Sequence, residues 1–127
     1  MFKIRYKSHH DVGNVISKFT KNFKASKEDF ISLLEEVNVS KQLALYFHTP
    51  YCDKICSFCN MNRKQLDNDL EEYTKYICDE IKKYGAYKFC KTSEVDVVFF
   101  GGGTPTIFKK EQLEKILKTL RENFIFS

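Results

Sequence analysis

Residues 43–59, LALYFHTPYCDKICSFC, join a continuous apolar run to three closely spaced cysteines. The apolar run has the composition of a buried parallel strand, and Pro50 ends it because proline cannot continue a central hydrogen-bonded ladder. We therefore predict a strand over 43–48 and a loop over 51–66 that carries the cysteines. Ligand sites in parallel α/β architectures gather where strands end, so this loop is a candidate binding site.

The same order of elements is repeated farther along the chain. Residues 95–100, VDVVFF, predict a second buried strand, and the run Gly101-Gly102-Gly103-Thr104-Pro105 breaks it. The glycine run could approach a cofactor closely because glycine has no Cβ, although alone it is a weak signal and a simple tight turn is the alternative. Both loops follow parallel strands, so we expect them to face each other across one rim of the sheet.

Helical periodicity accounts for the segments between these strands. It predicts helices over about 27–38, 67–83 and 110–122, with Ser26 and Asp29 as a capping box for the first helix and Gly85 as the end of the second. Residues 124–126 are a candidate third strand. The residues expected to face the core are Leu70, Tyr73, Ile77, Ile81 and Tyr84 on the second helix, and Leu113, Ile116, Leu117 and Leu120 on the third.

Composition indicates a chain that can form one compact domain. The chain has 127 residues, of which 43% are hydrophobic, and a net charge of +4, enough for one compact core. No apolar run is long enough to span a bilayer, and no secretory signal is recognisable, so we expect a cytoplasmic protein. Residues 1–27 hold seven Lys or Arg and one acid; we interpret this segment as a solvated lead-in and expect no nucleic-acid partner.

The spacing of the three cysteines indicates a metal centre. Cys52, Cys56 and Cys59 form a C-x3-C-x2-C pattern, and the odd total of five cysteines argues against a disulfide framework. Thiolates suit iron–sulfur clusters, zinc or copper(I). Structural zinc takes four protein ligands, commonly as two pairs, whereas three thiolates leave one iron of a [4Fe-4S] cluster open. The spacing favours the cluster, and a zinc site completed by a distant ligand is the alternative.

The two motifs together resemble a known family. YFHTPYC at residues 46–52, the cysteine pattern that follows, and FFGGGTPT at residues 99–106 resemble the radical S-adenosylmethionine (SAM) proteins of the oxygen-independent coproporphyrinogen III oxidase family. That family includes a dehydrogenase, a heme chaperone and the heme-opening anaerobilin synthase. The resemblance covers about residues 43–122. It implies the first βα units of a partial (β/α)6 radical SAM barrel, together with a [4Fe-4S] cluster and S-adenosyl-L-methionine as cofactors.

The resemblance also implies roles for single residues. Cys52, Cys56 and Cys59 would hold the cluster, whose open iron would chelate the methionine part of SAM. The other matching positions would contact SAM: Tyr46 touches the cofactor, Phe58 lies by the adenine, and Gly102, Gly103 and Thr104 lie at the methionine amino group. No residue of this chain is assigned as catalytic. His48 could help to order the site, and a histidine satisfied at the end of a strand is an equally good interpretation.

The resemblance further implies a tetrapyrrole substrate, heme or a porphyrinogen, and a flavodoxin or ferredoxin as electron donor. The dehydrogenase branch usually has a further cysteine two residues after the last ligand, and Asn60-Met61 stands there instead. This weakens the dehydrogenase assignment and leaves the chaperone and the heme-opening enzyme. Residues 58–63, FCNMNR, resemble the heme-opening group more closely, so we predict anaerobic heme ring opening with methyl transfer; a heme chaperone or a coproporphyrinogen III dehydrogenase is the alternative.

Two βα units cannot close a barrel, so we expect a fragment of a longer protein with an exposed strand edge and apolar face. The expected organisation is a basic segment with a short helix over 1–42 and the N-terminal part of the barrel over 43–127.

Overall fold

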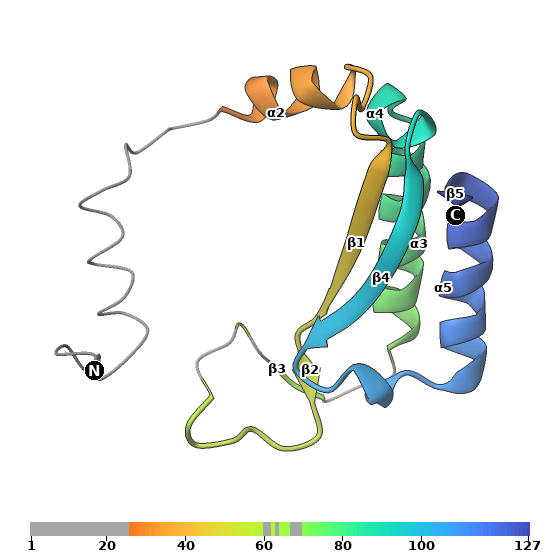
Figure 1. Cartoon of the computed structure of the whole chain (residues 1–127). Coiled ribbons are helices and arrows are strands. Elements are labelled where there is room, and N and C mark those ends of the chain that lie inside the picture. The colour runs from red at the N-terminus through yellow and green to blue at the C-terminus, as the bar shows by residue number, and fades with distance from the viewer. Residues whose placement is uncertain (1–25, 60–61, 63, 67–69) are drawn as a thin grey trace, which may run out of the picture. The chain divides into compact units, whose positions relative to one another are not determined.

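The computed structural model describes residues 26–59, 62, 64–66 and 70–127. The chain divides into two compact units, residues 1–30 and 31–127, and the second unit contains the strands and both predicted loops (Figure 1). Most of the basic segment, residues 1–25, lies outside the described residues, so the predicted division at residue 42 stays a prediction.

The first described helix, α2, runs from Lys27 to Leu34. The predicted capping box is confirmed: the Asp29 amide donates to Ser26 Oγ at 3.1 Å, and the Ser26 amide donates to Asp29 Oδ2 at 2.8 Å. The helix ends before residue 38 because Asn38 is hydrogen-bonded elsewhere, with its amide donating to Thr92 Oγ1 and its side chain donating to Ser93 Oγ.

Three parallel strands form the main sheet in the order β1-β4-β5: Gln42–Thr49, Glu94–Gly102 and Ile125–Phe126. This confirms the predicted parallel α/β architecture and the third strand. The prediction that Gly101 ends the second strand is wrong. β4 continues through Gly101, which pairs with His48 of β1. The hydrogen bonds between parallel strands join main-chain groups, so a glycine can take part in them.

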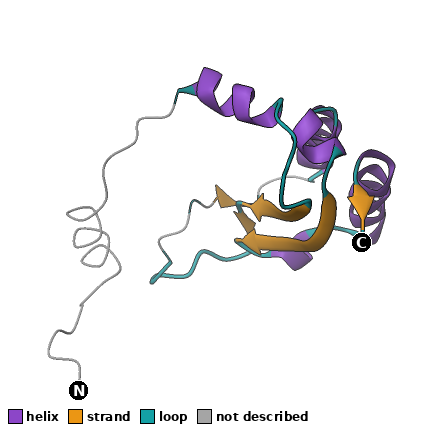
Figure 2. Ribbon diagram, turned by 45° about the horizontal axis from the view of Figure 1, so that its top comes forward, coloured by secondary structure: helices purple, strands orange, loops and turns teal. Residues whose placement is uncertain are grey.

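Helices cover one face of this sheet (Figure 2). α3 (Glu71–Gly85) and α5 (Lys110–Asn123) pack together there, with the short α4 (Lys88–Lys91) and the 3-10 helix η1 (Pro105–Ile107) in the connections. Gly85 is the last residue of α3, as predicted, but it does not have the left-handed conformation of a stop signal. The core between helices and sheet includes Ile77, Ile81, Val95, Ile116, Leu120 and Phe124.

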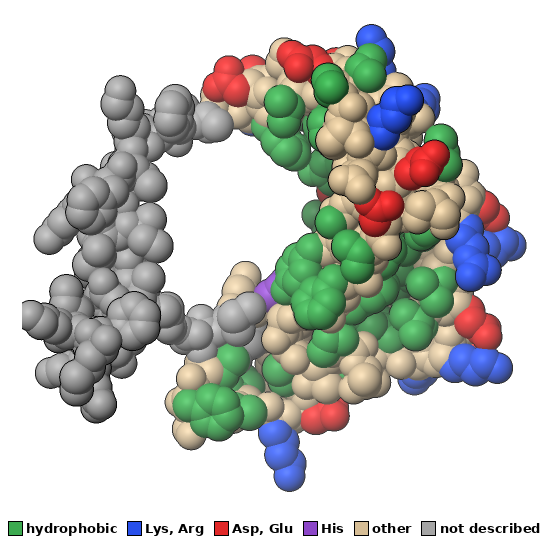
Figure 3. All heavy atoms as spheres, viewed as in Figure 1, with side chains coloured by type: hydrophobic (Ala, Val, Ile, Leu, Met, Phe, Trp, Pro, Cys, Tyr) green, Lys and Arg blue, Asp and Glu red, His purple; other side chains and the backbone are tan. Residues whose placement is uncertain are grey.

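The opposite face of the sheet is open, so the strands predicted as buried are covered on one side only. Tyr46 is 53% exposed, Val97 53% and Phe99 61%, and hydrophobic side chains gather over this part of the molecule in Figure 3. The predicted exposed apolar face is thereby confirmed. The inward orientation predicted for Leu113 and Leu117 is wrong, because both lie at the margin of the α5 stripe and are more than a third exposed.

The loop predicted over 51–66 contains two short strands at its base. β2 (Tyr51–Cys52) pairs in parallel with β3 (Lys64–Gln65) and forms a second sheet of two strands. This correction matters for the site because the pair joins the two ends of the cysteine loop. No helix in the described residues is long and apolar enough to cross a membrane.

Candidate cofactor site

The cysteine loop and the glycine loop meet at the carboxyl end of the sheet, as predicted. Gly103 follows β4, and its amide donates to the Thr49 carbonyl at 2.5 Å. The Thr104 amide donates to the Tyr51 carbonyl at 2.9 Å. Because Thr49 and Tyr51 lead directly into Cys52, these two bonds hold the glycine loop against the start of the cysteine loop.

The far end of the cysteine loop is attached to the same place. The Lys64 amide donates to the Pro50 carbonyl at 2.6 Å, and the Leu66 amide donates to the Cys52 carbonyl at 2.9 Å. The β2–β3 pair therefore closes the loop at its base. Cys52 belongs to this closed base, whereas Cys56 and Cys59 lie on the part of the loop that extends from it.

The three thiols consequently differ in exposure. Cys52 is buried, Cys59 is half-buried and Cys56 is exposed, and all three are free of disulfides. The Cys59 amide donates to the Cys56 carbonyl at 3.2 Å, which makes residues 56–59 a turn. In the described part of the chain, no three His, Cys, Asp or Glu side chains are close enough together to hold a single metal ion.

Each glycine from Gly101 to Gly103, at the end of β4 and the start of the loop, makes room for a different neighbour. A Cβ on Gly101 would lie 2.9 Å from ring atoms of both Tyr46 and Phe99, and one on Gly102 would lie 2.7 Å from Cε1 of His48. A Cβ on Gly103 would lie 2.7 Å from Cys52 Sγ. Gly102 also has a φ of +105°, a conformation that side chains rarely adopt.

His48 links Tyr46, on the open face of the sheet, to Asn62, which lies on the cysteine loop shortly before β3. Its Nε2 lies 3.0 Å from the Asn62 carbonyl, and its Nδ1 lies 3.2 Å from the Tyr46 hydroxyl. A carbonyl only accepts, so Nε2 donates in the contact with Asn62, and in the Nε2–H tautomer Nδ1 accepts from the Tyr46 hydroxyl. Tyr46 also stacks on Phe99 with ring centroids 5.8 Å apart. Both ring nitrogens of His48 are thus hydrogen-bonded near the end of β1, which agrees both with a satisfied histidine and with a role in ordering Tyr46.

The other residues predicted to contact SAM occupy different surroundings. Phe58 is 88% exposed at the tip of the cysteine loop, and the described residues do not bring it to Tyr46 or to the glycine loop. The amides of Gly103 and Thr104 are already bonded to carbonyls. Main-chain contacts from Gly103 to a ligand would therefore use its carbonyl oxygen, which suits a donor such as an ammonium group. The Thr104 carbonyl already accepts from the Ile107 amide at 3.0 Å.

The residues at this rim fit an iron–sulfur cluster. Three free thiols lie on one loop, and thiolates are the ligands that iron–sulfur clusters prefer. Gly103 leaves space directly beside Cys52 Sγ, which a larger residue would fill. A cluster is also larger than a single ion, so its ligands need not converge on one point. The remaining two cysteines, Cys78 on α3 and Cys90 on α4, are buried, and burial raises the pKa of the Cys90 thiol.

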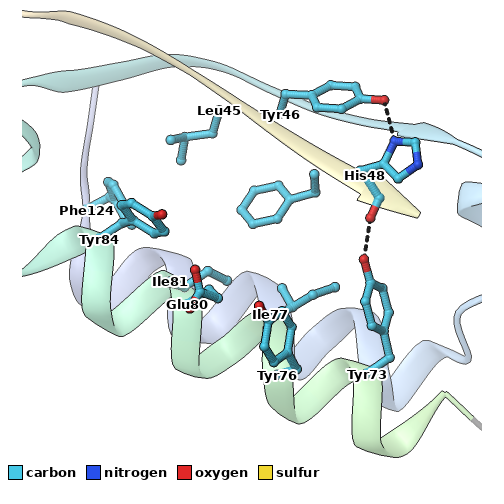
Figure 4. Close-up of a pocket in the computed structure, with 11 residues that line it drawn as sticks. Leu45, Tyr46, His48, Tyr73, Tyr76, Ile77, Glu80, Ile81, Tyr84 and Phe124 are labelled. Atoms are coloured by element: carbon cyan, nitrogen blue, oxygen red, sulfur yellow. Dashed lines mark hydrogen bonds between the residues drawn. The ribbon is translucent and has the colours of Figure 1, made fainter. Parts of the chain in front are cut away.

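Sequence reasoning missed two parts of this site. The β2–β3 pair has two residues in each strand, too few for any periodicity to be visible. Tyr73 was expected only as a core residue of α3, yet its hydroxyl donates to the His48 carbonyl at 2.5 Å (Figure 4). No sequence signal distinguishes Tyr73 from the other members of its helical stripe.

Comparison with known proteins gives concordant results. No protein-family model matches the chain. The oxygen-independent coproporphyrinogen III oxidase of Mannheimia haemolytica is 31% identical over 109 residues, which are 84% of this chain and 71% of that protein. The protein of the same name from Escherichia coli K12 is 36% identical over 89 residues, 68% of this chain and 19% of that protein. The anaerobilin synthase of Escherichia coli O157:H7 is 28% identical over 91 residues, 71% of this chain and 20% of that protein.

A solved structure has the same fold. The coproporphyrinogen III oxidase of Escherichia coli, described as a radical SAM enzyme, matches 90% of this chain with a TM-score of 0.70 and 26% identity, and the match covers 28% of that structure. The chain thus spans about a fifth of the length of several of these relatives.

Proposed function

The chain belongs to the oxygen-independent coproporphyrinogen III oxidase family of radical SAM proteins, and we propose that it serves radical chemistry on a tetrapyrrole. One observation carries this proposal: the loop with Cys52, Cys56 and Cys59 and the glycine loop are hydrogen-bonded to each other at the carboxyl end of a parallel sheet. Radical SAM proteins of this family use a [4Fe-4S] cluster and SAM. The substrate and activity of the whole protein are part of the proposal.

In this proposal the three thiolates hold the cluster with different degrees of preorganisation. Cys52 is fixed in the closed base of the loop and backed by Gly103. Cys56 and Cys59 lie on the exposed part of the loop and take their final positions as the cluster is bound. The site is therefore partly built before the cluster arrives, which lowers the ordering cost of binding.

The residues around the thiols would bind and orient SAM. Tyr46 presents its ring on the open face, held by His48 and Phe99. The glycine loop, from Gly102 to Thr104, would offer the Gly103 carbonyl oxygen to the amino group of the methionine part. Phe58 would cover the adenine, and its exposure implies that the loop tip folds over the cofactor. Bound together, cluster and SAM supply a one-electron cleavage of the sulfonium, and the protein supplies binding, orientation and exclusion of water.

The electron would come from a flavodoxin or ferredoxin, and the substrate class would be a tetrapyrrole, because the relatives are named as a coproporphyrinogen III oxidase and an anaerobilin synthase. Among family activities we propose heme ring opening with methyl transfer. Asn60-Met61, in place of the further cysteine expected in the dehydrogenase branch, argues against the dehydrogenase, and the resemblance of residues 58–63 to the heme-opening group supports this choice over the chaperone.

The proposal is tested first on the cofactors. Full-length protein purified without oxygen is expected to contain four iron and four sulfide per chain, and the Cys52→Ser, Cys56→Ser and Cys59→Ser variants are expected to lose most of both. Cys90→Ser is the matched control, because Cys90 is a buried cysteine outside the loop. A tetrahedral zinc ion without sulfide in the wild-type protein would overturn the proposal.

The substrate is tested with heme and with coproporphyrinogen III in separate anaerobic reactions containing a reductant and SAM. Loss of the heme spectrum with release of iron and formation of a methylated product supports heme opening. Stable transfer of intact heme to an acceptor protein indicates the chaperone instead, and conversion of coproporphyrinogen III indicates the dehydrogenase.

A further inference from the structure

Tyr73 lies in the first turn of α3, outside the residues expected to bind a cofactor, yet it contacts both sides of the candidate site. Its hydroxyl donates to the His48 carbonyl at 2.5 Å, on the side of β1 that faces α3 (Figure 4). The same residue, His48, uses its ring to bond Tyr46 and the Asn62 carbonyl. A movement of the His48 main chain would therefore move the ring and both of its partners.

The ring of Tyr73 contacts the chain on either side of the two loops. It stands edge-on to Tyr51, the residue before Cys52, with centroids 5.2 Å apart and an interplanar angle of 69°. It lies parallel to Phe108, which follows the glycine loop and η1, with centroids 6.4 Å apart. The Tyr51 carbonyl in turn accepts a hydrogen bond from the Thr104 amide. Tyr73 therefore packs against the chain just before Cys52 and just after the glycine loop, the two segments that this bond connects.

Tyr73 remains protonated under ordinary conditions, so its hydroxyl is available as a donor. Burial raises its pKa, with smaller contributions in the same direction from Tyr51 and Tyr76. Phe108 is buried, which fixes one wall of the contact. Positions of binding groups must be held to within roughly 0.5 Å for productive geometry, and such precision depends on supporting residues of this kind.

We propose that Tyr73 is a positioning residue for SAM binding, which sets the ends of the cysteine and glycine loops relative to each other through His48, Tyr51 and Phe108 without touching the cofactors. This inference rests on the proposed function, because it concerns the same site. It predicts that the loss of one hydroxyl, on a residue of α3 rather than of either loop, weakens SAM binding while the cluster is retained.

The test compares Tyr73→Phe with Tyr76→Phe in full-length protein purified without oxygen. Tyr76 is one helical turn farther on, and its ring stacks on Tyr73 with centroids 6.4 Å apart. It is 61% exposed, and its hydroxyl makes no hydrogen bond within the described part of the chain. The two variants therefore remove the same atom from adjacent rings, of which only the Tyr73 ring is hydrogen-bonded to β1 through its hydroxyl.

Three quantities are measured: iron and sulfide per chain, the dissociation constant of SAM, and the change that SAM causes in the electron paramagnetic resonance spectrum of the reduced cluster. Tyr73→Phe is expected to keep its iron and sulfide, to bind SAM more weakly by up to about fivefold, the limit set by the net energy of one neutral hydrogen bond, and to show a smaller or broader spectral change. Tyr76→Phe is expected to match the wild-type protein in all three.

A second variant keeps the inference testable if Tyr73→Phe does not fold. Phe108→Leu retains an apolar core residue but removes the ring parallel to Tyr73, and it is expected to weaken SAM binding in the same way. If both variants bind SAM with wild-type affinity and spectrum, and only their melting temperatures fall, Tyr73 is a packing residue and the inference is overturned while the proposed function stands. If the wild-type protein contains no cluster, both are overturned.

Discussion

The three cysteines of the loop have the same chemistry but different access to solvent. Cys56 is exposed, Cys59 is half-buried, and Cys52 is buried, as are Cys78 and Cys90. Alkylation requires an accessible thiolate. In cluster-free protein, we expect iodoacetamide to modify Cys56 first, Cys59 next, and the three buried thiols at least tenfold more slowly, with the raised pKa of Cys90 slowing it further.

Mass spectrometry of peptides after timed alkylation measures this order directly. Denaturant provides the control, because unfolding should bring all five thiols to similar rates. Modification of Cys52 as fast as Cys56 in the folded chain would contradict the closed loop base.

Gly103 supplies a sharper prediction at this scale. A Cβ there would lie 2.7 Å from Cys52 Sγ and 2.9 Å from the Thr49 carbonyl oxygen, and it would approach the Tyr51 carbonyl oxygen even more closely. Two of these neighbours are main-chain atoms that cannot rotate away. We expect Gly103→Ala to displace Cys52 and to reduce the iron bound after reconstitution severalfold, as measured by iron and sulfide analysis.

The placement of the two loops could be predicted from the sequence, because each loop follows a strand of the predicted parallel sheet, whereas the ligand roles of single residues stay predictions. The two loops were expected at one rim, and the hydrogen bonds between them confirm this. The partner of each glycine could not be predicted, because it depends on the register of β1 against β4. The bond from Tyr73 to the His48 carbonyl is likewise a matter of packing between distant elements.

At the scale of elements, the contact between α3 and α5 depends on Gly85. A Cβ on Gly85 would lie 2.7 Å from the Asn123 carbonyl oxygen and 3.0 Å from its Cβ. Crowding of this kind costs about 1–3 kcal/mol, which exceeds the roughly 0.5–1 kcal/mol that alanine gains over glycine in a helix. We expect Gly85→Ala to lower the free energy of unfolding by about 1 kcal/mol in urea titrations.

The same variant separates stability from cofactor binding. Gly85 lies at the opposite end of α3 from the loops, so Gly85→Ala should bind iron as well as the wild-type protein does. It is therefore a control for Gly103→Ala, and equal loss of iron in both variants would mean that iron binding reports only general stability.

The junction of α3 with β1 is expected to be sensitive to alkaline pH. The pKa of Tyr73 is raised above its usual 10.0 by burial, so the folded chain holds this proton more tightly than the unfolded chain does. The stabilisation is fully present below the usual pKa and is lost as the pH rises through the folded-state value. Urea midpoints should therefore fall more steeply above pH 10 in the wild-type protein than in Tyr73→Phe, and parallel curves would contradict this account.

The elements themselves were predictable where periodicity is long. The helices over 71–85 and 110–123 and the strands over 42–49 and 94–102 fall close to their expected ranges. The errors have two causes. Strand pairing overrides the local preference of glycine where β4 continues through Gly101 beside β1. The β2–β3 pair has too few residues to show a periodic sequence pattern. The interior of each strand was expected to be buried on both sides, but helices cover one face only.

At the scale of the whole molecule, this open face has a physical consequence. Tyr46, Val97 and Phe99 lie on it and are each more than half exposed, and β1 has no neighbour beyond β4 among the described strands. Contiguous apolar surface and an unpaired strand edge both favour association. The relatives extend well beyond the matched region, so in a whole protein of this kind other segments can cover such a face.

We therefore expect the 127-residue chain, expressed alone, to associate at micromolar concentration. Under the proposed function, we also expect this chain to cleave SAM at only a small fraction of the rate of the full-length protein. Light scattering after size-exclusion chromatography measures the association. The double variant Val97→Thr and Phe99→Ser makes the open face more polar without touching the core under the helices, and it should restore a monomer. Leu117→Ser is the matched control, because Leu117 is also partly exposed but lies on α5. A wild-type chain that is monomeric, or a control that prevents association as well as the double variant does, would show that the open face does not drive association.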